Sequence, residues 1–432
     1  MMDRAEIVRL DKARVWHPYT AMDAYIADYD PIVVARAQGA RLYDADGRSY
    51  LDANSSWWVA TLGHGHPRLV AALKAQADTL AHSALAGIAH EPAARLADEL
   101  VGVAPEGLSR VFFTDDGSTA VEVAVKMAVQ MWRQLGAPDK TRFVALDGAF
   151  HGDSVGAASL GGVEVFRRPF AGLLFDCVHA PFPEASAYER AFDAMKQLVT
   201  TDRDRIAAVV VEPVVQGSAG MRVYDPAYLR ELSLLCARLD VLLIVDEVFA
   251  GYGRTGPMWA SQHAGITPDL FCIGKAMSPL LPMGATLTTE RVFDAFRGGK
   301  ERALLYGHTL CGNPLGAALA REVLAVYRDT ALLEQTRPKA AAIARAFERI
   351  GRERGVVRTR SLGMIGAADL GSGGYFGALG WRVFEEARKR GAYLRPLGDT
   401  VYVTPPLTID ETDLDLLLAI AHESITAAME AG

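Results

Sequence analysis

The hydrophobic positions of this chain alternate between short continuous runs and longer stretches with helical spacing. Runs rich in Val, Ile, Leu and Phe predict strands at residues 110–114, 142–146, 207–212, 241–246 and 269–273. Continuous apolar runs, in place of strict alternation, are typical of strands that are covered on both faces. Residues 119–135 and 228–239, which lie between these runs, have the spacing of crossover helices. The pattern therefore predicts an α/β fold with a mostly parallel sheet.

The pattern changes after about residue 325. Amphipathic helices are predicted at residues 339–351, 381–390 and 411–429, and short strands at 365–370 and 401–405. A chain of 432 residues is long enough for two domains. We expect residues 61–325 to form the large domain and residues 326–432 to form a smaller α+β domain, which the N-terminal segment 1–60 joins.

Composition and charge narrow the functions to consider. Half of the residues are hydrophobic (50%) and 22% are charged, which is typical of a globular protein. The net charge of −7 and the lack of a basic run argue against nucleic-acid binding. No apolar run is long enough for a signal peptide or a membrane span, so we expect a cytoplasmic protein. The four cysteines are scattered singly and predict neither a disulfide framework nor a metal site.

Polar residues directly follow three of the predicted strands. Asp246 ends the run VLLIVD, Lys275 follows DLFCIG, and Gly117-Ser118 follow RVFFTDD. Ligands of open α/β sheets bind outside the carboxyl ends of the strands, so we expect these residues to lie together. Each also has an ordinary interpretation. Asp246 could cap a helix or form an ion pair, Lys275 could be a surface lysine, and Ser118 or Thr119 could be the N-cap of the next helix.

Taken together, these residues suit pyridoxal phosphate (PLP). The backbone N–H groups at a helix start and the helix dipole form an anion site for a phosphate. A buried carboxylate and an amine at the same edge match the ring nitrogen and the aldehyde of this cofactor. Neither G-x-x-x-x-G-K-[ST] nor a G-x-G-x-x-G after the first strand is present, which argues against other phosphate-binding folds. We predict that Lys275 attaches the cofactor and that Asp246 keeps the ring nitrogen protonated.

One longer motif resembles a known family. Ile244-Val245-Asp246-Glu247-Val248 and Gly251-Tyr252-Gly253-Arg254-Thr255-Gly256, followed by Gly274-Lys275, resemble the class III PLP-dependent aminotransferases. The resemblance extends from Trp16 to Pro406. It implies the fold type I architecture of PLP-dependent transferases. It also implies a homodimer whose active site is shared across the interface.

Four further motifs resemble the branch of this class that acts in biotin biosynthesis. They are Trp16-His17-Pro18-Tyr19-Thr20, Ser55-Ser56-Trp57-Trp58, Phe150-His151-Gly152-Asp153-Ser154 and Arg395-Pro396-Leu397-Gly398-Asp399. The resemblance implies conversion of 8-amino-7-oxononanoate to 7,8-diaminononanoate, with S-adenosylmethionine as the amino donor. Lysine as the donor, and another class III ω-aminotransferase acting on ω-amino acids, diamines or ornithine, are the alternatives. A non-catalytic PLP-fold protein is a third.

The resemblance also implies a role for each matching residue. The implied cofactor-binding residues are Gly117, Ser118, Phe150, Glu212, Asp246 and Lys275, with His308 and Thr309 reaching the partner's phosphate. The implied substrate-binding residues are Tyr19, Trp57, Phe150, Asp153, Gly307 and Arg395. The guanidinium of Arg395 would bind the substrate carboxylate through two hydrogen bonds. Glu212 could equally be a structural strand terminus.

Two positions of the chain depart from the family's usual pattern. Phe150 stands where tyrosine is usual, so an aromatic face is kept but a hydroxyl is lost. Residues 276–284 lack the usual glycine pair and form a shorter segment. Both changes border the substrate site and bear on the identity of the donor. Trp58 is expected to pack in the core if the backbone there is extended, because adjacent side chains of a strand face opposite ways.

Overall fold

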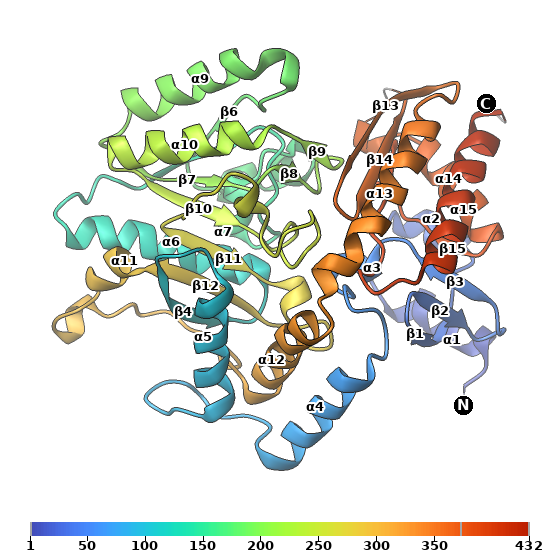
Figure 1. Ribbon diagram of the computed structural model, residues 1–432, viewed down its shortest axis with the longest axis horizontal. Helices are drawn as coiled ribbons and strands as arrows, with labels where there is room; N and C mark the ends of the chain where they lie inside the picture. The colour runs from blue at the N-terminus through green and yellow to red at the C-terminus, as the bar shows by residue number, and fades with distance from the viewer. Residues whose placement is uncertain (1, 372–373, 431–432) are drawn as a thin grey trace.

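A seven-stranded sheet forms the centre of the larger lobe in this computed structural model, which describes residues 2–371 and 374–430 (Figure 1). Its strands, in spatial order, are β4 (Leu108–Thr114), β12 (Gly284–Thr289), β11 (Leu270–Ile273), β10 (Leu242–Asp246), β7 (Ile206–Val211), β5 (Arg142–Leu146) and β6 (Cys177–Ala180). β12 pairs antiparallel with both of its neighbours, and every pair from β11 to β6 is parallel. The predicted α/β fold with a mostly parallel sheet is confirmed.

Each of the five strands predicted in this lobe is present, and their bounds differ from the prediction by two residues at most. β6 and β12 were not predicted. β12 has the sequence GATLTT, whose small and polar residues form no apolar run although its first five residues are buried. β6 is only partly buried and contains a cysteine and a histidine.

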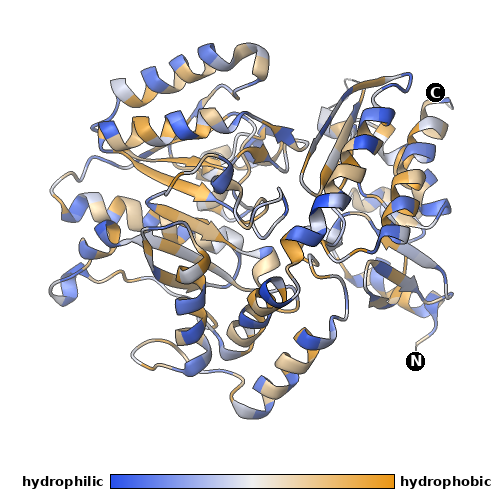
Figure 2. Ribbon diagram, in the orientation of Figure 1, coloured by the Kyte–Doolittle hydropathy of each residue, from blue (hydrophilic) through white to orange (hydrophobic). Residues whose placement is uncertain are grey.

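Helices cover both faces of this sheet. α6 (Gly117–Gln134) packs on one face, where it shares a hydrophobic cluster with Leu242 and Ile244 of β10. α10 (Pro226–Leu239) packs on the other face with Leu243 and Val245. Alternate residues of one buried strand therefore belong to two different cores. Figure 2 shows the result, with apolar strands at the centre and helices that are apolar along one side only.

The smaller lobe contains a three-stranded antiparallel sheet, β13 (Val356–Leu362), β14 (Ile365–Leu370) and β16 (Thr400–Val403). A second sheet joins β1 (Val34–Gln38), β2 (Arg41–Asp44) and β3 (Ser49–Asp52) to β15 (Ala392–Tyr393). β15 runs parallel to β3, so the N-terminal strands pair with the C-terminal part of the chain. In Figure 1 the blue N-terminal segment accordingly lies beside the red C-terminal helices.

The C-terminal helices are α13 (Leu332–Ile350), α14 (Leu379–Lys389) and α15 (Glu411–Glu430). α14 and α15 lie within two residues of their predicted bounds, but α13 begins well before residue 339 because the helix continues through Pro338. The remaining helices are α1 (Arg4–Arg14), α2 (Met22–Ala27), α3 (Ser55–Trp58), α4 (Pro67–Thr79), α5 (Glu91–Val103), α7 (Val155–Leu160), α8 (Glu164–Arg167), α9 (Tyr188–Thr201), α11 (Glu290–Asp294) and α12 (Pro314–Asp329). A hairpin of β8 (Val215–Gln216) and β9 (Arg222–Val223) completes the fold. Among the helices described, none is long and apolar enough to cross a membrane.

Asn54 connects the N-terminal segment to the C-terminal strands. Its buried side-chain amide donates to the carbonyl of Tyr402 (3.2 Å) and accepts from the backbone N–H of Arg395 (2.8 Å). The hydroxyl of the next residue, Ser55, donates to the carbonyl of Thr404 (2.7 Å). These bonds fix the start of α3, which carries two tryptophans, against β16.

We expect Asn54→Ala to lower the free energy of unfolding by about 2–4 kcal/mol, because two backbone groups would lose their partner in a buried setting. Chemical denaturation followed by circular dichroism measures this change. Asn54→Asp is the comparison variant, since it keeps an acceptor for Arg395 but loses the donor to Tyr402 and places a buried carboxylate beside that carbonyl. An Asn54→Ala variant with the wild-type denaturation midpoint would show that these bonds contribute nothing.

Candidate active site

A cavity of about 650 Å³ opens at the carboxyl edge of the large sheet, with residues of both lobes in its wall. The predicted site residues that line it are Tyr19, Trp57, Gly117, Ser118, Phe150, Asp153, Glu212, Asp246 and Lys275. Gly307, His308, Thr309 and Arg395 are not among the lining residues. The rule that polar residues gather where parallel strands end therefore places most of the predicted site in one cavity.

Asp246 lies at the end of β10 and is almost fully buried, with 4% of its surface exposed. One carboxylate oxygen is 2.8 Å from Nδ1 of His151, and the other accepts the backbone N–H of Val248 at 3.0 Å. His151 is itself buried. These contacts compensate the cost of desolvating the carboxylate and fix its orientation toward the cavity.

Lys275 follows β11 and begins a short 3₁₀ turn, Lys275–Met277. Its backbone has φ of 44°, a left-handed conformation that costs a non-glycine residue energy and is often found at functional sites. Its Nζ lies 4.9 Å from the centre of the Trp58 ring. Burial lowers the pKa of Lys275, although the carboxylates of Asp246 and Glu212 oppose this shift. The amine therefore loses its proton more readily than an exposed lysine does.

The start of α6 lies at the wall of the cavity. Asp116 is the N-cap and forms a capping box with Thr119, which corrects the expectation that Ser118 or Thr119 is the cap. The side chain of Ser118 is consequently left to face the cavity. A Cβ at Gly117 would lie 2.4 Å from a methyl of Val248, so only glycine fits between the helix start and the segment after Asp246.

Glu212 follows β7, and its carboxylate bonds to two backbone amides. One oxygen accepts from Phe150 (3.0 Å) and the other from Gly217 (2.9 Å). Burial raises the pKa of Glu212 to about 7, and the nearby Asp246 adds to this shift. Glu212 therefore holds two loops of the cavity wall in place.

Trp57 and Trp58 lie on a left-handed turn. Residues 55–58 all have positive φ, between 45° and 72°, so the extended backbone considered for this segment is wrong. Trp58 is buried, as expected for a core residue, yet both tryptophans line the cavity. The turn points both indoles toward the same space, which an extended strand would not do.

Aromatic rings and one carboxylate form the opposite wall. The hydroxyl of Tyr19 donates to Asp153, and the Tyr19 ring contacts Trp57 and Phe166 at centroid distances of 5.4 and 5.6 Å. Phe166 of α8 also contacts Phe150, at 5.6 Å. It contacts Tyr375 of the smaller lobe as well, at 4.9 Å. The rings meet edge to face, the arrangement that aromatic pairs prefer.

Arg395 lies just behind this wall. Its guanidinium carbon is 5.8 Å from the Trp57 ring centre and 5.1 Å from that of Trp381, and it donates to the carbonyl of Tyr19 (3.2 Å). The cation is therefore next to two lining residues without itself lining the cavity.

The segment Gly307-His308-Thr309 lies apart from the cavity. His308 bonds to Asp115 through Nδ1 and to the hydroxyl of Tyr306 through Nε2, both at 2.8 Å. Thr309 and Gly307 are exposed. The neighbouring Leu305 has 89% of its surface exposed, which is unusual for a leucine.

Comparison with known proteins identifies the family. The sequence profile of the aminotransferase class-III family matches residues 24–425. The chain belongs to the class-III aminotransferases. It is therefore a PLP-dependent transaminase, as its sequence motifs predicted.

Individual relatives of this aminotransferase agree with that assignment. It is 43% identical to the adenosylmethionine-8-amino-7-oxononanoate aminotransferase of Synechococcus elongatus, over 94% of this chain and 97% of the relative. The crystal structure of the enzyme of the same name from Methanocaldococcus jannaschii superposes with a TM-score of 0.94 at 33% identity, covering 98% of this chain and 99% of that one. An amine transaminase from an uncultivated Pseudomonas species, in its PLP-bound form, superposes with a TM-score of 0.91 at 32% identity, covering 96% and 98%.

The cavity of this aminotransferase fits the cofactor of its family. Nε2 of His151 and Oγ of Ser278 are buried in the cavity wall, and neither has a hydrogen-bond partner within residues 2–371 and 374–430. Buried polar atoms of this kind are rare in proteins unless a ligand or water satisfies them. The helix start at Gly117 and Ser118, the carboxylate of Asp246 and the amine of Lys275 supply the groups that PLP requires.

Sequence reasoning gave no role to several residues of this cavity. His151 stands inside a quoted motif but was given no role, although a histidine between Phe150 and Asp153, both of which were assigned to the site, is a polar candidate. Phe166 and Tyr375 come from segments far apart in the sequence that carry no motif, so only the folded structure brings them together.

We expect His151→Phe to reduce turnover about tenfold or more, because Asp246 would lose the partner that orients its carboxylate. The amine-donor half-reaction, followed by absorbance, measures this effect. His151→Asn should retain more activity, since its amide N–H can take the place of Nδ1. If the Phe variant turns over as fast as the wild type, Asp246 does not depend on His151.

Proposed function

We propose that this aminotransferase transfers an amino group from S-adenosylmethionine to 8-amino-7-oxononanoate in biotin biosynthesis. The observation that carries the proposal is the cavity itself, which is lined by Lys275, Asp246 and several aromatic rings and has the Arg395 guanidinium next to the ring of Trp57. The names of the Synechococcus and Methanocaldococcus relatives agree with this substrate pair.

In the proposed reaction, Lys275 attaches the cofactor and moves the proton. When bound, PLP supplies an electron-accepting ring and an aldehyde that carries the amino group between substrates. The lowered pKa of Lys275 favours an uncharged amine, which takes a proton from the amino-bearing carbon and later returns one. Asp246, fixed by His151, keeps the proton on the ring nitrogen. Gly117 and Ser118 at the start of α6 bind the phosphate.

The aromatic wall serves the substrates. Tyr19, Trp57 and Phe150 line the slot for the aliphatic chain of the oxo-acid, and Arg395 binds its carboxylate. Asp153 accepts a hydrogen bond from the hydroxyl of Tyr19, so its carboxylate lies beside one of these rings. A cationic donor is attracted both by a carboxylate and by aromatic faces.

Lysine is the second candidate for the donor, and Phe150 is the observation that favours considering it. Phe150 presents no hydroxyl to a substrate. Its backbone N–H donates to Glu212, which holds the residue in place in the cavity wall. The donor contacts of this chain therefore differ from those of a tyrosine-bearing relative.

The absorbance spectrum of the PLP-loaded protein tests both assignments. We expect S-adenosylmethionine to bleach the visible band of the cofactor and 8-amino-7-oxononanoate to restore it, because the two half-reactions interconvert the cofactor's aldehyde and amine forms. Lysine is added to a separate sample in place of the first donor. If the donors bleach the band and 8-amino-7-oxononanoate does not restore it, the biotin-pathway proposal is contradicted. That result would favour another class III ω-aminotransferase.

We further propose that the chain acts as a homodimer in which Gly307, His308 and Thr309 complete the partner's site. Exposed apolar residues next to this segment support the proposal, with Leu305 89% and Leu310 53% exposed. The division into a large domain of residues 61–325 and a small domain of residues 326–432, joined by the N-terminal residues 1–60, is part of the same proposal.

Mixing two inactive variants tests the shared site. Lys275→Ala removes the attachment amine, and Thr309→Glu would place a negative charge beside the partner's phosphate. We expect co-expressed chains to regain about half of the wild-type turnover per heterodimer, because one of its two sites combines an intact Lys275 with an intact Thr309. Mixtures as inactive as either variant alone would contradict a site shared through Thr309.

A further inference from the structure

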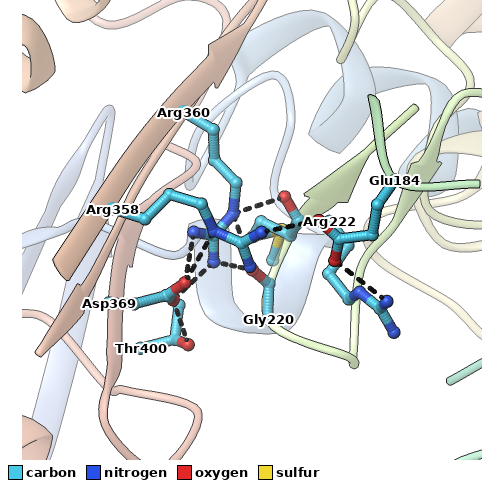
Figure 3. Close-up of polar contacts among 8 residues, drawn as sticks. Glu184, Gly220, Arg222, Arg358, Arg360, Asp369 and Thr400 are labelled. Atoms are coloured by element: carbon cyan, nitrogen blue, oxygen red, sulfur yellow. Dashed lines mark hydrogen bonds and ion pairs between the residues drawn. The ribbon is translucent and has the colours of Figure 1, made fainter. Parts of the chain in front are cut away.

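Arg360 of β13 connects the two lobes beside the cavity. Figure 3 shows its side chain extending from the smaller lobe toward the turn that joins β8 to β9 in the larger lobe. Nε of Arg360 donates to the carbonyls of Gly220 (3.0 Å) and Met221 (2.8 Å), and Nη2 also donates to Gly220. All of these acceptors are main-chain carbonyls. Arg360 can therefore hold the turn independently of the side chains that the turn carries.

A second edge of the same guanidinium is held by Asp369 of β14. Nη1 and Nη2 of Arg360 donate to the two carboxylate oxygens at 2.8 and 2.7 Å. Thr400 of β16 donates to Asp369 at 2.8 Å, so all three strands of the small sheet take part. Only 10% of the Arg360 side chain is exposed. A planar guanidinium can serve a carboxylate and two carbonyls at once, which a lysine ammonium cannot do in a single plane.

The turn that Arg360 holds leads to the cavity. The backbone N–H groups of Gly220 and Met221 donate to the carbonyl of Gly217, at 3.2 and 3.0 Å. Gly217 lines the cavity and donates its own N–H to Glu212, whose other oxygen accepts the N–H of Phe150. A continuous series of hydrogen bonds thus runs from the small sheet to the loop that carries Phe150.

The fit between the lobes at this point is close. Gly220 has φ of +90°, and a Cβ there would lie 2.9 Å from the hydroxyl of Thr400. The turn can therefore approach β16 only because it has no side chain at this position. This contact and the bonds of Arg360 act on the same two residues, Gly220 and Met221.

We propose that Arg360 is a positioning residue for the transamination, which fixes the Gly217–Met221 turn and through it Glu212 and Phe150 against the cofactor. The inference rests on the proposed placement of PLP between Phe150, Asp246 and Lys275. Arg360 itself touches neither cofactor nor substrate. Its effect reaches the site through backbone hydrogen bonds. We therefore expect Arg360 to change the affinity for the cofactor more than the affinity for the substrate.

Arg358 provides a matched control on the same strand. It donates to the same Asp369 (3.2 Å) and to Glu184 of the larger lobe (3.3 Å), and Figure 3 shows it beside Arg360. Both of these acceptors are carboxylates, and neither is a carbonyl of the turn. Arg358→Met therefore removes an ion pair between the lobes but leaves the turn attached.

The test compares Arg360→Met and Arg360→Lys with Arg358→Met in the PLP-loaded protein. We expect both Arg360 variants to raise the Kd of PLP about tenfold and to change the visible circular dichroism of the bound cofactor. The kcat of the donor half-reaction should fall by a similar factor, with less change in KM. Arg358→Met should stay within about twofold of the wild type in each measurement.

Either of two results would overturn the inference. The first is an Arg360→Met protein that matches Arg358→Met in Kd, dichroism and kcat. The second is an Arg360→Met protein that has a lower thermal stability but an unchanged cofactor spectrum. In that case Arg360 would have a structural role only. If Arg360→Met does not fold, Arg360→Lys decides by the same measurements. Lys275→Ala, run in parallel, separates the two proposals. Wild-type turnover in Lys275→Ala would contradict the proposed site itself, whereas turnover that is lost in Lys275→Ala but unchanged in Arg360→Met would contradict only the role of Arg360.

Discussion

Asp246 is a carboxylate at the end of a strand whose residues are all buried, and the cost of desolvating it constrains everything at this edge of the sheet. His151 and the N–H of Val248 offset that cost and leave the carboxylate in one orientation. Val248 in turn lies so close to the start of α6 that only glycine fits at residue 117. The start of α6 and the carboxylate of Asp246 are therefore placed by one set of contacts and not by two separate ones.

Much of this arrangement could be predicted because it depends on local pattern. The apolar runs of β5, β7 and β10 define buried parallel strands, and the rule for their carboxyl ends brings Asp246 and Lys275 together. β12 could not be found in the same way, because its buried residues are small and its place in the sheet depends on β4 and β11. The left-handed turn of Ser55–Trp58 was likewise beyond sequence reasoning, since L-residues rarely adopt it without tertiary support.

The cavity belongs to both lobes, so its shape depends on how they are joined. Arg360 makes this connection by bonding its side chain to main-chain groups of the larger lobe. Asn54 uses the same kind of bond within the smaller lobe, where it joins the N-terminal segment to the C-terminal strands. Such bonds tolerate changes in the side chains of the segment that is held. They do not tolerate loss of the residue that holds it, because buried backbone groups would then be unpaired. The aromatic contact between Phe166 and Tyr375 also joins the two lobes, at the wall of the cavity.

The pairing of β4 with β12 also bears on how the protein is made. β4 has no other neighbour in its sheet, and its partner lies about 170 residues later in the chain. On the ribosome, β4 and the helix start that follows it must wait until residue 289 has emerged before they can enter the sheet. β3 can pair with β2 as soon as both are made, but its second neighbour, β15 at Ala392–Tyr393, emerges much later. Segments synthesised early are thus among the last to complete their strand pairing.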